Sequence, residues 1–191
     1  MKKKFVKRGL DLIGCVIALI VFLIPSIVVA MAVKLTSKGP VLYWSDRIGK
    51  GNAVFRMPKF RTMRVNTPQV ATHLLAQPDA FLTPIGGFLR RSSLDELPQL
   101  WSILKGDMTL VGPRPALFNQ DDLVAQRTEL GVHHLTPGLT GWAQINGRDD
   151  LPIPVKVRYD AEYASRQTFL FDIYIIAKTV MKVFARSGVS H

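Results

Sequence analysis

The sequence predicts an α+β protein with an N-terminal membrane helix and a compact cytoplasmic α/β domain, which includes a short β-hairpin and interfacial amphipathic helices. Three observations lead to this fold class. Residues 12–33 carry no charge, residues 41–55 hold two β-rich runs around a glycine-rich turn, and the chain from residue 155 onward has a helical pattern. We place the membrane segment in residues 1–36 and the domain in residues 37–191, because this length suffices for one ordinary core.

The composition narrows the class of partner. The chain has 25 Lys+Arg against 14 Asp+Glu, a formal net charge of +11, which indicates nucleic acid, an anionic membrane surface or a phosphorylated substrate. The single cysteine, Cys15, excludes an intramolecular disulfide and suits a reducing compartment. The adjacent His133 and His134 lack the spacing of a zinc site, so we interpret them as surface or structural residues.

The uncharged segment, residues 12–33, has the length that a hydrocarbon-spanning helix requires. A secretory signal is the alternative, because the N-terminus is basic and residues 30–32 resemble a cleavage site. The apolar stretch is longer than the roughly 7–15 apolar residues of a signal peptide, and a strongly basic domain follows it. We therefore favour a membrane helix.

Basic residues lie on both sides of this segment, so the positive-inside rule assigns both flanks to the cytoplasm. They are Lys2, Lys3, Lys4, Lys7 and Arg8 before it and Lys34, Lys38 and Arg47 after it. Pro25 and Ser26 lie near its middle, where proline removes a backbone donor and clashes with the preceding turn. The residues alone leave two alternatives open: a helix that bends there and returns to the same side, and a kinked helix that spans the bilayer.

The elements of the domain follow in chain order. We predict a hairpin of residues 41–44 and 53–55, followed by a helix over 81–89 and a helix over 97–104 that ends at Lys105-Gly106. A short strand within 109–117 and a helix over 117–130 come next. A turn, a strand and a turn over 136–148 then precede a helical region from 155 to the end. Asp121 and Asp122 suit the N-terminus of their helix better than catalysis. In the last helix Lys178, Lys182 and Arg186 recur at a spacing of four, which is typical of a helix lying in the membrane interface.

Two adjacent acids, Asp95 and Glu96, stand out in this basic chain. One interpretation is a capping box, in which Glu96 reaches back to the amide of Ser93 and Asp95 faces the positive end of the helix dipole. The other is a phosphoryl-transfer site, in which the acids hold Mg²⁺ or attack phosphorus and nearby arginines spread the phosphate charge.

Several arginines favour the second interpretation. Arg90 and Arg91 directly precede the acids, and Arg148 follows a tight Asn-Gly turn. Arg114 lies between two prolines, whose fixed φ angles present its guanidinium rigidly for a bidentate partner such as phosphate. Basic groups that converge on a carboxylate pair predict a site for an additional anion.

The combination of "KFRTM", "LRRSSLDELPQLWSILKGDMTLVGPRP" and "PGLTGWAQINGR" behind a hydrophobic N-terminal segment resembles the bacterial sugar transferases that start glycan assembly. These are monotopic phosphoglycosyl transferases acting on undecaprenyl phosphate. The resemblance covers the chain from about Lys7 to Arg186, and we expect the minimal catalytic form, without an additional transmembrane bundle.

The resemblance implies roles for particular residues. Asp95 matches the nucleophile and Glu96 a ligand of Mg²⁺, which Asp95 also helps to hold, and the phosphate- or nucleotide-binding positions match Lys59, Arg90, Arg114 and Arg148. Ser45 stands where the family usually has glutamine, so we assign no role to Arg47. The family also implies a re-entrant membrane helix, bent here at Pro25 and Ser26, although their order is the reverse of the family's.

The implied activity is transfer of a sugar 1-phosphate from a UDP-sugar to undecaprenyl phosphate, with release of UMP and a covalent Asp95 intermediate. We expect the protein in the inner, cytoplasmic membrane with its catalytic domain on the cytoplasmic face, serving the first membrane step of a glycan pathway before downstream glycosyltransferases. A membrane-anchored, non-enzymatic nucleic-acid-binding protein is the alternative from another class. We expect no nucleic acid, since we find no recognised nucleic-acid motif and few aromatic residues beside the basic positions.

Overall fold

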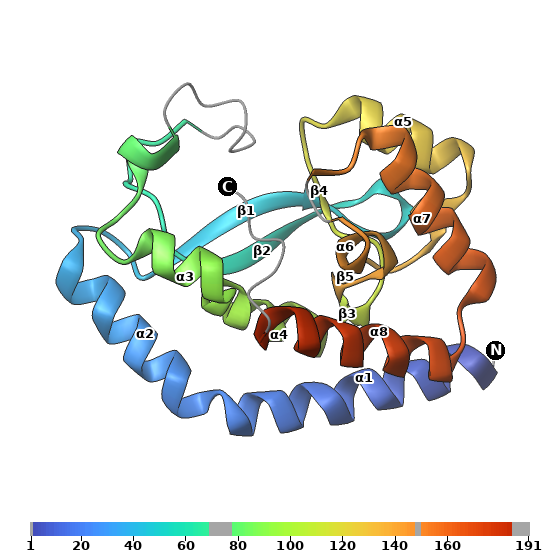
Figure 1. Cartoon of the computed structure of the whole chain (residues 1–191), viewed down its shortest axis with the longest axis horizontal. Helices are drawn as coiled ribbons and strands as arrows, with labels where there is room; N and C mark the ends of the chain where they lie inside the picture. The colour runs from blue at the N-terminus through green and yellow to red at the C-terminus, as the bar shows by residue number, and fades with distance from the viewer. Residues whose placement is uncertain (1, 69–77, 148–149, 185–191) are drawn as a thin grey trace.

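The computed structural model describes residues 2–68, 78–147 and 150–184, and it confirms a mixed fold of helices and small sheets (Figure 1). The α-helices are α1 (Lys2–Val21), α2 (Leu23–Thr36), α3 (Gly86–Ser92), α4 (Leu100–Lys105), α5 (Asp121–Glu129), α6 (Trp142–Ile145), α7 (Ile153–Arg166) and α8 (Phe169–Phe184). The 3₁₀ helices are η1 (Lys50–Asn52), η3 (Pro78–Phe81), η4 (Leu94–Gln99) and η5 (Val132–His134). The strands are β1 (Leu42–Ile48), β2 (Val54–Phe60), β3 (Thr109–Val111), β4 (Ala116–Leu117) and β5 (Gly138–Thr140).

The apolar N-terminal segment forms two helices, α1 and α2, that meet at a bend of 61° (Figure 1). We predicted the bend at Pro25 and Ser26, but the break between the helices falls at Phe22. Pro25 and Ser26 lie in the first turn of α2. A proline ring clashes with the carbonyl four residues earlier, which here belongs to Val21, the last residue of α1. Proline is well tolerated in a first helical turn, and its effect therefore appears upstream of its own position.

The bent pair has the length and composition of a membrane segment only when its two halves are taken together. Within the described residues, neither α1 nor α2 nor any other single helix is long and apolar enough to cross a bilayer. Phe5–Val21 and Leu23–Thr36 together meet that requirement. One side of the pair is buried against the domain through Cys15, Val29 and Val33, while most of its large apolar side chains are exposed.

The predicted hairpin is confirmed, and its strands are longer than the sequence indicated. Strands β1 and β2 pair antiparallel from Leu42 opposite Phe60 to Ile48 opposite Val54, and β4 adds to the other edge of β1. The predicted strand within residues 109–117 is divided into β3 and β4, because Pro113 and Pro115 cannot donate to a ladder. Residues 136–148 supply the short strand β5, which pairs parallel with β3. The short helix α6, which was not predicted, follows β5 and leads into the predicted turn at Asn146 and Gly147.

Glycines allow the backbones of β3 and β5 to approach closely. A Cβ atom on Gly138 would lie 2.1 Å from the amide nitrogen of Gly112, and one on Gly141 would lie 2.1 Å from the carbonyl oxygen of Gly112. No side chain fits at either position without moving backbone, which explains the glycines of the "VGPRP" and "PGLTG" motifs. This contact fixes the chain immediately before Arg114.

The helices that were predicted after the hairpin are confirmed with changes at their ends. The 81–89 helix begins only at Gly86, and Leu89 alone of its large apolar residues is fully buried. Helix α4 ends where predicted, before a Gly106 with φ 96°. Helix α5 begins at Asp121, four residues after the predicted start at 117, because Ala116 and Leu117 form β4. The C-terminal helical region is two helices, α7 and α8; Arg186 of the predicted basic line lies outside the described residues.

Two of the hydrophobic clusters join the bent helix pair to the rest of the chain. Cys15 packs with Met57, Leu100, Ile103 and Met108, and a second cluster joins Val29 and Val33 with Phe60 and Leu89. Residues from 1–36 and from 37–191 therefore contribute to shared cores.

Three charged residues of α1 anchor this helix to the domain. Asp11 is buried, and its carboxylate accepts hydrogen bonds from the Thr109 hydroxyl at 2.5 Å and the Leu110 amide at 3.1 Å. Lys7 pairs with Asp172 of α8 at 2.7 Å, and Arg8 donates to the carbonyls of Ile103 and Leu104 at the end of α4. Two of the basic residues that suggested a membrane flank thus make specific contacts within the protein.

Candidate active site

Asp95 and Glu96 lie on the 3₁₀ helix η4, directly after the bend that ends α3. The bend is made by Ser93, a non-glycine residue with φ 57°, which is an uncommon conformation that the surrounding structure must support. Asp95 is only 7% exposed, which is rare for an aspartate unless it is paired or functional.

The structure does not form the capping box. The Ser93 side chain makes no capping hydrogen bond, and its amide donates to the carbonyl of Arg90. The Glu96 carboxylate accepts hydrogen bonds from Lys59 and Arg114 and does not close the start of the helix. The interpretation of these acids as a helix cap is therefore wrong, and the acid pair faces basic side chains.

Lys59 and Arg114 approach the pair from two separate elements. The Lys59 ammonium, on β2, lies 2.9 Å from Oε1 of Glu96 and 3.9 Å from Oδ2 of Asp95. The Arg114 guanidinium, from the link between β3 and β4, lies 3.2 Å from the same Oε1 atom of Glu96. The β1–β2 hairpin and the β3–β5 pair thus bring together residues that are 37 and 18 positions from Glu96 in the sequence.

Arg90 completes the basic surroundings from the last turn of α3. Its Nε donates to the hydroxyl of Thr62 at 3.0 Å, which fixes the plane of the guanidinium. Burial lowers the pKa of Arg90, and the charges of Asp95 and Asp79 oppose that shift. An arginine stays protonated despite such a shift, so Arg90 brings a positive charge to the immediate surroundings of Asp95.

Burial raises the pKa of Asp95 above its ordinary value. Lys59 opposes the rise, Glu96 adds to it, and Arg114 and Arg90 lower the pKa again. A carboxylate held in this way is poorly hydrated, and a poorly hydrated anion is a better nucleophile than one in water.

A second ion pair, which sequence reasoning missed, holds Arg114 in position. Arg127 of α5 donates to the carbonyl of Arg114 at 2.8 Å, while its Nε and Nη2 donate to Asp160 of α7 at 3.0 and 2.6 Å. Arg127 and Asp160 are both buried. The sequence offers no local signal for this pair, because its members are 33 residues apart.

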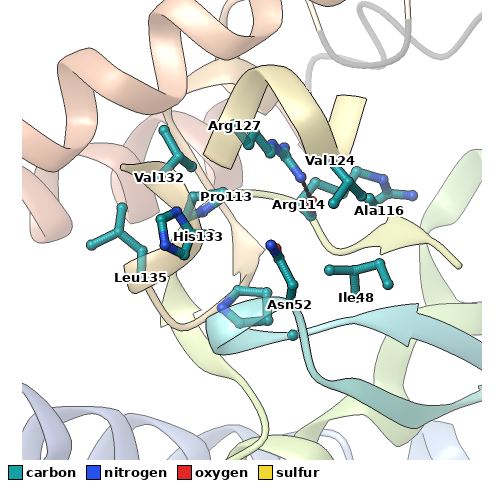
Figure 2. A pocket seen from close by; sticks show the side chains of 12 residues that line it. Ile48, Asn52, Pro113, Arg114, Ala116, Val124, Arg127, Val132, His133 and Leu135 are labelled. Atoms are coloured by element: carbon teal, nitrogen blue, oxygen red, sulfur yellow. Dashed lines mark hydrogen bonds between the residues drawn. The ribbon is translucent and has the colours of Figure 1, made fainter. Parts of the chain in front are cut away.

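The small pocket beside Arg114 is part of this support and is no substrate cavity. Figure 2 shows Arg127 next to Arg114, above Asn52 and His133. The cavity that these residues line measures about 30 Å³, which admits water and no larger ligand. Nδ1 of His133 is buried there and has no hydrogen-bond partner among the described residues. His133 is partly buried and His134 is exposed, and their interpretation as surface or structural residues stays a prediction.

Other candidates stand as follows. Arg148 lies outside the described residues, so its predicted place near the acids stays a prediction. Arg47, to which no role was assigned, donates to the carbonyl of Pro115 at 3.2 Å and therefore supports the loop that carries Arg114. Asp121 and Asp122 occupy the first turn of α5, as expected of helix-terminal charges.

The acid pair offers the donor set that Mg²⁺ uses with phosphate substrates. Among the described residues, no group of three or more His, Cys, Asp or Glu side chains could hold a metal ion alone. Mg²⁺ is usually held by one or two carboxylates together with substrate phosphates and water, and it does not require a protein cage. Adjacent carboxylates at Asp95 and Glu96 fit that requirement.

The chain is similar over most of its length to a family of known proteins. The family model for bacterial sugar transferases matches residues 2–186. The exopolysaccharide production protein ExoY of Sinorhizobium fredii is 34% identical over 95% of this chain and 87% of its own length. The chain therefore belongs to the bacterial sugar transferase family.

Larger relatives carry more specific names. A UDP-glucose:undecaprenyl-phosphate glucose-1-phosphate transferase of Escherichia coli (strain K12) is 38% identical over 97% of this chain and 41% of its own length. A UDP-N-acetylgalactosamine-undecaprenyl-phosphate N-acetylgalactosaminephosphotransferase of Aeromonas hydrophila is 34% identical over 96% of this chain and 45% of its own length. The chain thus spans less than half the length of these curated relatives.

Proposed function

We propose that this protein transfers a sugar 1-phosphate from a UDP-sugar to undecaprenyl phosphate and releases UMP. The observation that carries the proposal is the buried Asp95 with the partly buried Glu96 beside it and Lys59, Arg90 and Arg114 around the two acids. The names of the related transferases support the same substrate class, and they differ in the sugar: N-acetylgalactosamine, glucose or galactose. They give no support to the alternative of a nucleic-acid-binding protein.

The proposed reaction has two displacements at one phosphorus atom. An oxygen of the Asp95 carboxylate bonds to the phosphorus that bears the sugar, and the anhydride bond to UMP breaks with its electron pair leaving on UMP. An oxygen of undecaprenyl phosphate then bonds to the same phosphorus and displaces Asp95. An acyl phosphate suits this exchange because it is as energy-rich as the anhydrides on either side, whereas a serine ester would trap the sugar phosphate.

The basic residues act on charge and orientation. Lys59 and Arg114 hold Glu96 and are placed to spread the negative charge that develops on the transferred phosphate. Repulsion between Asp95 and one phosphate charge is about 4 kcal/mol at roughly 4 Å and an effective dielectric near 20. Glu96 and Asp95 would hold Mg²⁺, which would supply further charge neutralisation. Arg148 completes the phosphate- or nucleotide-binding set in this proposal.

We further propose that residues 1–36 enter the cytoplasmic leaflet and return to the same side, with residues 37–191 as the catalytic domain on the cytoplasmic face of the inner membrane. The 61° bend between two exposed apolar helices supports this placement. The exposed apolar residues of α8, including Leu170 and Met181, support an interfacial position for that helix. The acid pair would then lie near the headgroups, where the acceptor phosphate is found, and the lipid product could pass to downstream glycosyltransferases.

The test uses purified, detergent-solubilised full-length protein with Mg²⁺, undecaprenyl phosphate and a panel of UDP-sugars, with UMP release as the readout. We expect release with at least one UDP-sugar and its abolition by Asp95→Asn or by chelation of the metal. Near-normal UMP release by Asp95→Asn would rule out Asp95 as nucleophile.

A second mechanism keeps the same substrates: both acids hold metal only, and the lipid phosphate attacks the UDP-sugar directly. Initial-rate patterns separate the two mechanisms. Ping-pong kinetics support the covalent intermediate, whereas a ternary-complex pattern supports direct attack.

A further inference from the structure

A second cavity lies where α2 ends, and it shares no lining residue with the acid pair or its basic partners. It measures about 560 Å³ and is lined by Thr36 and Lys38 after the helix, Arg61 and Arg64 after β2, and Thr83 and Pro84 before α3, among others. This volume is within the range of about 300–1,000 Å³ that is usual for small-ligand sites. In Figure 1 the end of α2 lies far from the strands β3 and β4 that flank Arg114.

The base of this cavity carries a buried positive charge. Arg61 is 5% exposed, and its guanidinium donates to three main-chain carbonyls, those of Pro40 at 2.7 Å, Lys38 at 2.6 Å and Ser37 at 3.0 Å. These carbonyls, together with the C-terminal end of the helix dipole, bring at most about half a negative elementary charge to the guanidinium. They fix the guanidinium in place but do not neutralise it.

Two more cations stand at the edge of the cavity. Lys38 and Arg64 are exposed, and neither forms an ion pair with any residue of the ranges 2–68, 78–147 and 150–184. Arg61 also lacks a carboxylate partner within the described part of the chain. Three positive charges around one cavity, with at most half a charge opposing them, make this a site for an anion.

The position of the cavity at the end of α2 indicates which kind of anion binds there. The apolar surface of α2, with Ile27, Val28 and Met31 exposed, ends just before the cavity, and Leu35 is the last large exposed apolar residue before the chain becomes polar. A helix that leaves a bilayer has its polar end at the headgroups, where anionic phospholipids attract Lys and Arg. We propose that this cavity binds the phosphate headgroup of an anionic phospholipid. The proposal rests on the membrane placement of α1 and α2 given under the proposed function.

Such a site would do more than attract the protein to the bilayer. Arg61 directly follows the last residue of β2, the strand that carries Lys59. Its side chain also donates hydrogen bonds to the turn that follows α2. A lipid phosphate bound at Arg61, Lys38 and Arg64 therefore fixes the depth of the helix end and of β2 together. The binding site thus couples membrane position to the strand that serves the acid pair.

The experiment titrates detergent-solubilised full-length protein with phosphatidylglycerol or with phosphatidylcholine and counts bound lipids by native mass spectrometry. We expect wild-type protein to bind its first phosphatidylglycerol more tightly than its first phosphatidylcholine. Lys38→Gln/Arg64→Gln should weaken phosphatidylglycerol binding by about 25-fold, at about fivefold for each cation, and leave phosphatidylcholine binding unchanged. Arg61 is left intact because its side chain supports the fold.

The matched control is Lys50→Gln/Arg158→Gln, which removes the same charges from exposed positions that do not line the cavity. It should keep the wild-type preference. Equal binding of both lipids by wild type, or loss of the preference in the control as well, would overturn the proposal in favour of non-specific attraction.

Two additional arms identify the source of the phosphate. Inorganic phosphate should fail to displace phosphatidylglycerol, because the apolar helix beside the cavity favours a lipid; displacement would mark a free-phosphate site and refute the proposal. If undecaprenyl phosphate displaces phosphatidylglycerol and Lys38→Gln/Arg64→Gln raises its KM, the cavity belongs to the acceptor and the proposal is wrong. Lipid titration and UMP release are separate readouts, so failure of the proposed enzyme activity would be recognised independently.

Discussion

Two of the buried carboxylates in the described part of the chain, Asp160 and Asp95, lie near arginines and are arranged in opposite ways. Asp160 accepts two hydrogen bonds from Arg127, at 3.0 and 2.6 Å. Among the described residues, the closest ion-pair contact of Asp95 is the Lys59 ammonium at 3.9 Å, and that ammonium lies nearer to Glu96, at 2.9 Å. Burial raises the pKa of both aspartates, so the cost of removing a carboxylate from water is common to the two sites.

The difference separates a closed ion pair, at Asp160, from a more open arrangement at Asp95, the residue that we propose as the nucleophile. At Asp160 the carboxylate oxygens are used in fixing Arg127, which in turn holds the carbonyl of Arg114. At Asp95 the closest ion-pair contact among the described residues is the Lys59 ammonium at 3.9 Å, so these residues leave the carboxylate oxygens open to another bond. Asp160 and Asp95 are both buried aspartates, and they differ in how the neighbouring basic side chains are directed. Arg127 donates directly to Asp160, whereas Lys59 donates to Glu96 and not to Asp95.

The largest effect on stability should come from breaking the closed pair. Asp160→Asn leaves the buried Arg127 without its carboxylate, and we expect the free energy of unfolding to fall by about 3–5 kcal/mol. Asp95→Asn is the matched substitution, and Lys59 and Arg114 keep Glu96 as partner. Denaturant unfolding in detergent should show a much smaller change for Asp95→Asn; equal losses would contradict the distinction.

The next effect should be on catalysis alone. Arg114→Gln removes the guanidinium at Glu96 but keeps the main-chain carbonyl that Arg127 holds. We expect kcat/KM for UMP release to fall by about 10²-fold, with the unfolding midpoint unchanged. Arg158→Gln on the exposed side of α7 serves as the control, and a comparable loss of activity there would show that net charge and not position is responsible.

A third, smaller effect concerns the anchors of α1. Asp11→Asn weakens the acceptor for the Thr109 hydroxyl and the Leu110 amide, which lie on β3 shortly before Arg114. We expect a loss of about 1–3 kcal/mol in unfolding free energy. Asp46→Asn, an acid of β1, is the comparison; if both variants unfold alike in the same detergent, Asp11 is no anchor.

The smallest effect belongs to an exposed pair on α7. The hydrogen bond from Trp142, and then that from Arg166, lowers the pKa of Glu162. A glutamate whose pKa is lower in the folded state than in the unfolded state stabilises the fold at pH values above its ordinary pKa. This stabilisation is lost as the pH falls through the folded-state pKa. Glu162→Gln should therefore lower the thermal midpoint slightly at neutral pH, and the difference from wild type should shrink on acidification. A difference that is constant with pH would refute this origin.

The sequence predicted features that depend on neighbours along the chain. The hairpin around Gly49–Gly51, the end of α4 at Gly106 and the acidic start of α5 all follow from local turn and helix chemistry, and the structure confirms them. The structure also brings Lys59, Arg90 and Arg114 close to Asp95 and Glu96, while the roles that the resemblance implies for them stay predictions.

What the sequence could not reveal depends on residues far apart in the chain. Asp11 and Thr109 are 98 positions apart, and no local pattern indicates that a charge beside an apolar segment is buried against a strand. The capping box failed for a related reason, because the cations from β2 and from the link after β3 compete for Glu96. Likewise, the helix break lies at Phe22 because the proline clash acts on the carbonyl four residues upstream.

The shared cores of the bent helix pair have a practical consequence for anyone who wishes to handle this protein without lipid. Cutting the chain after Thr36 would remove Cys15, Val29 and Val33 from clusters that contain Met57, Ile103 and Leu89. The remaining fragment would expose the apolar surface beneath them and aggregate, and it would not be released as a water-soluble catalyst. Solubility has to come from substitutions on the outer side of α1 and α2, with the inner side left as it is.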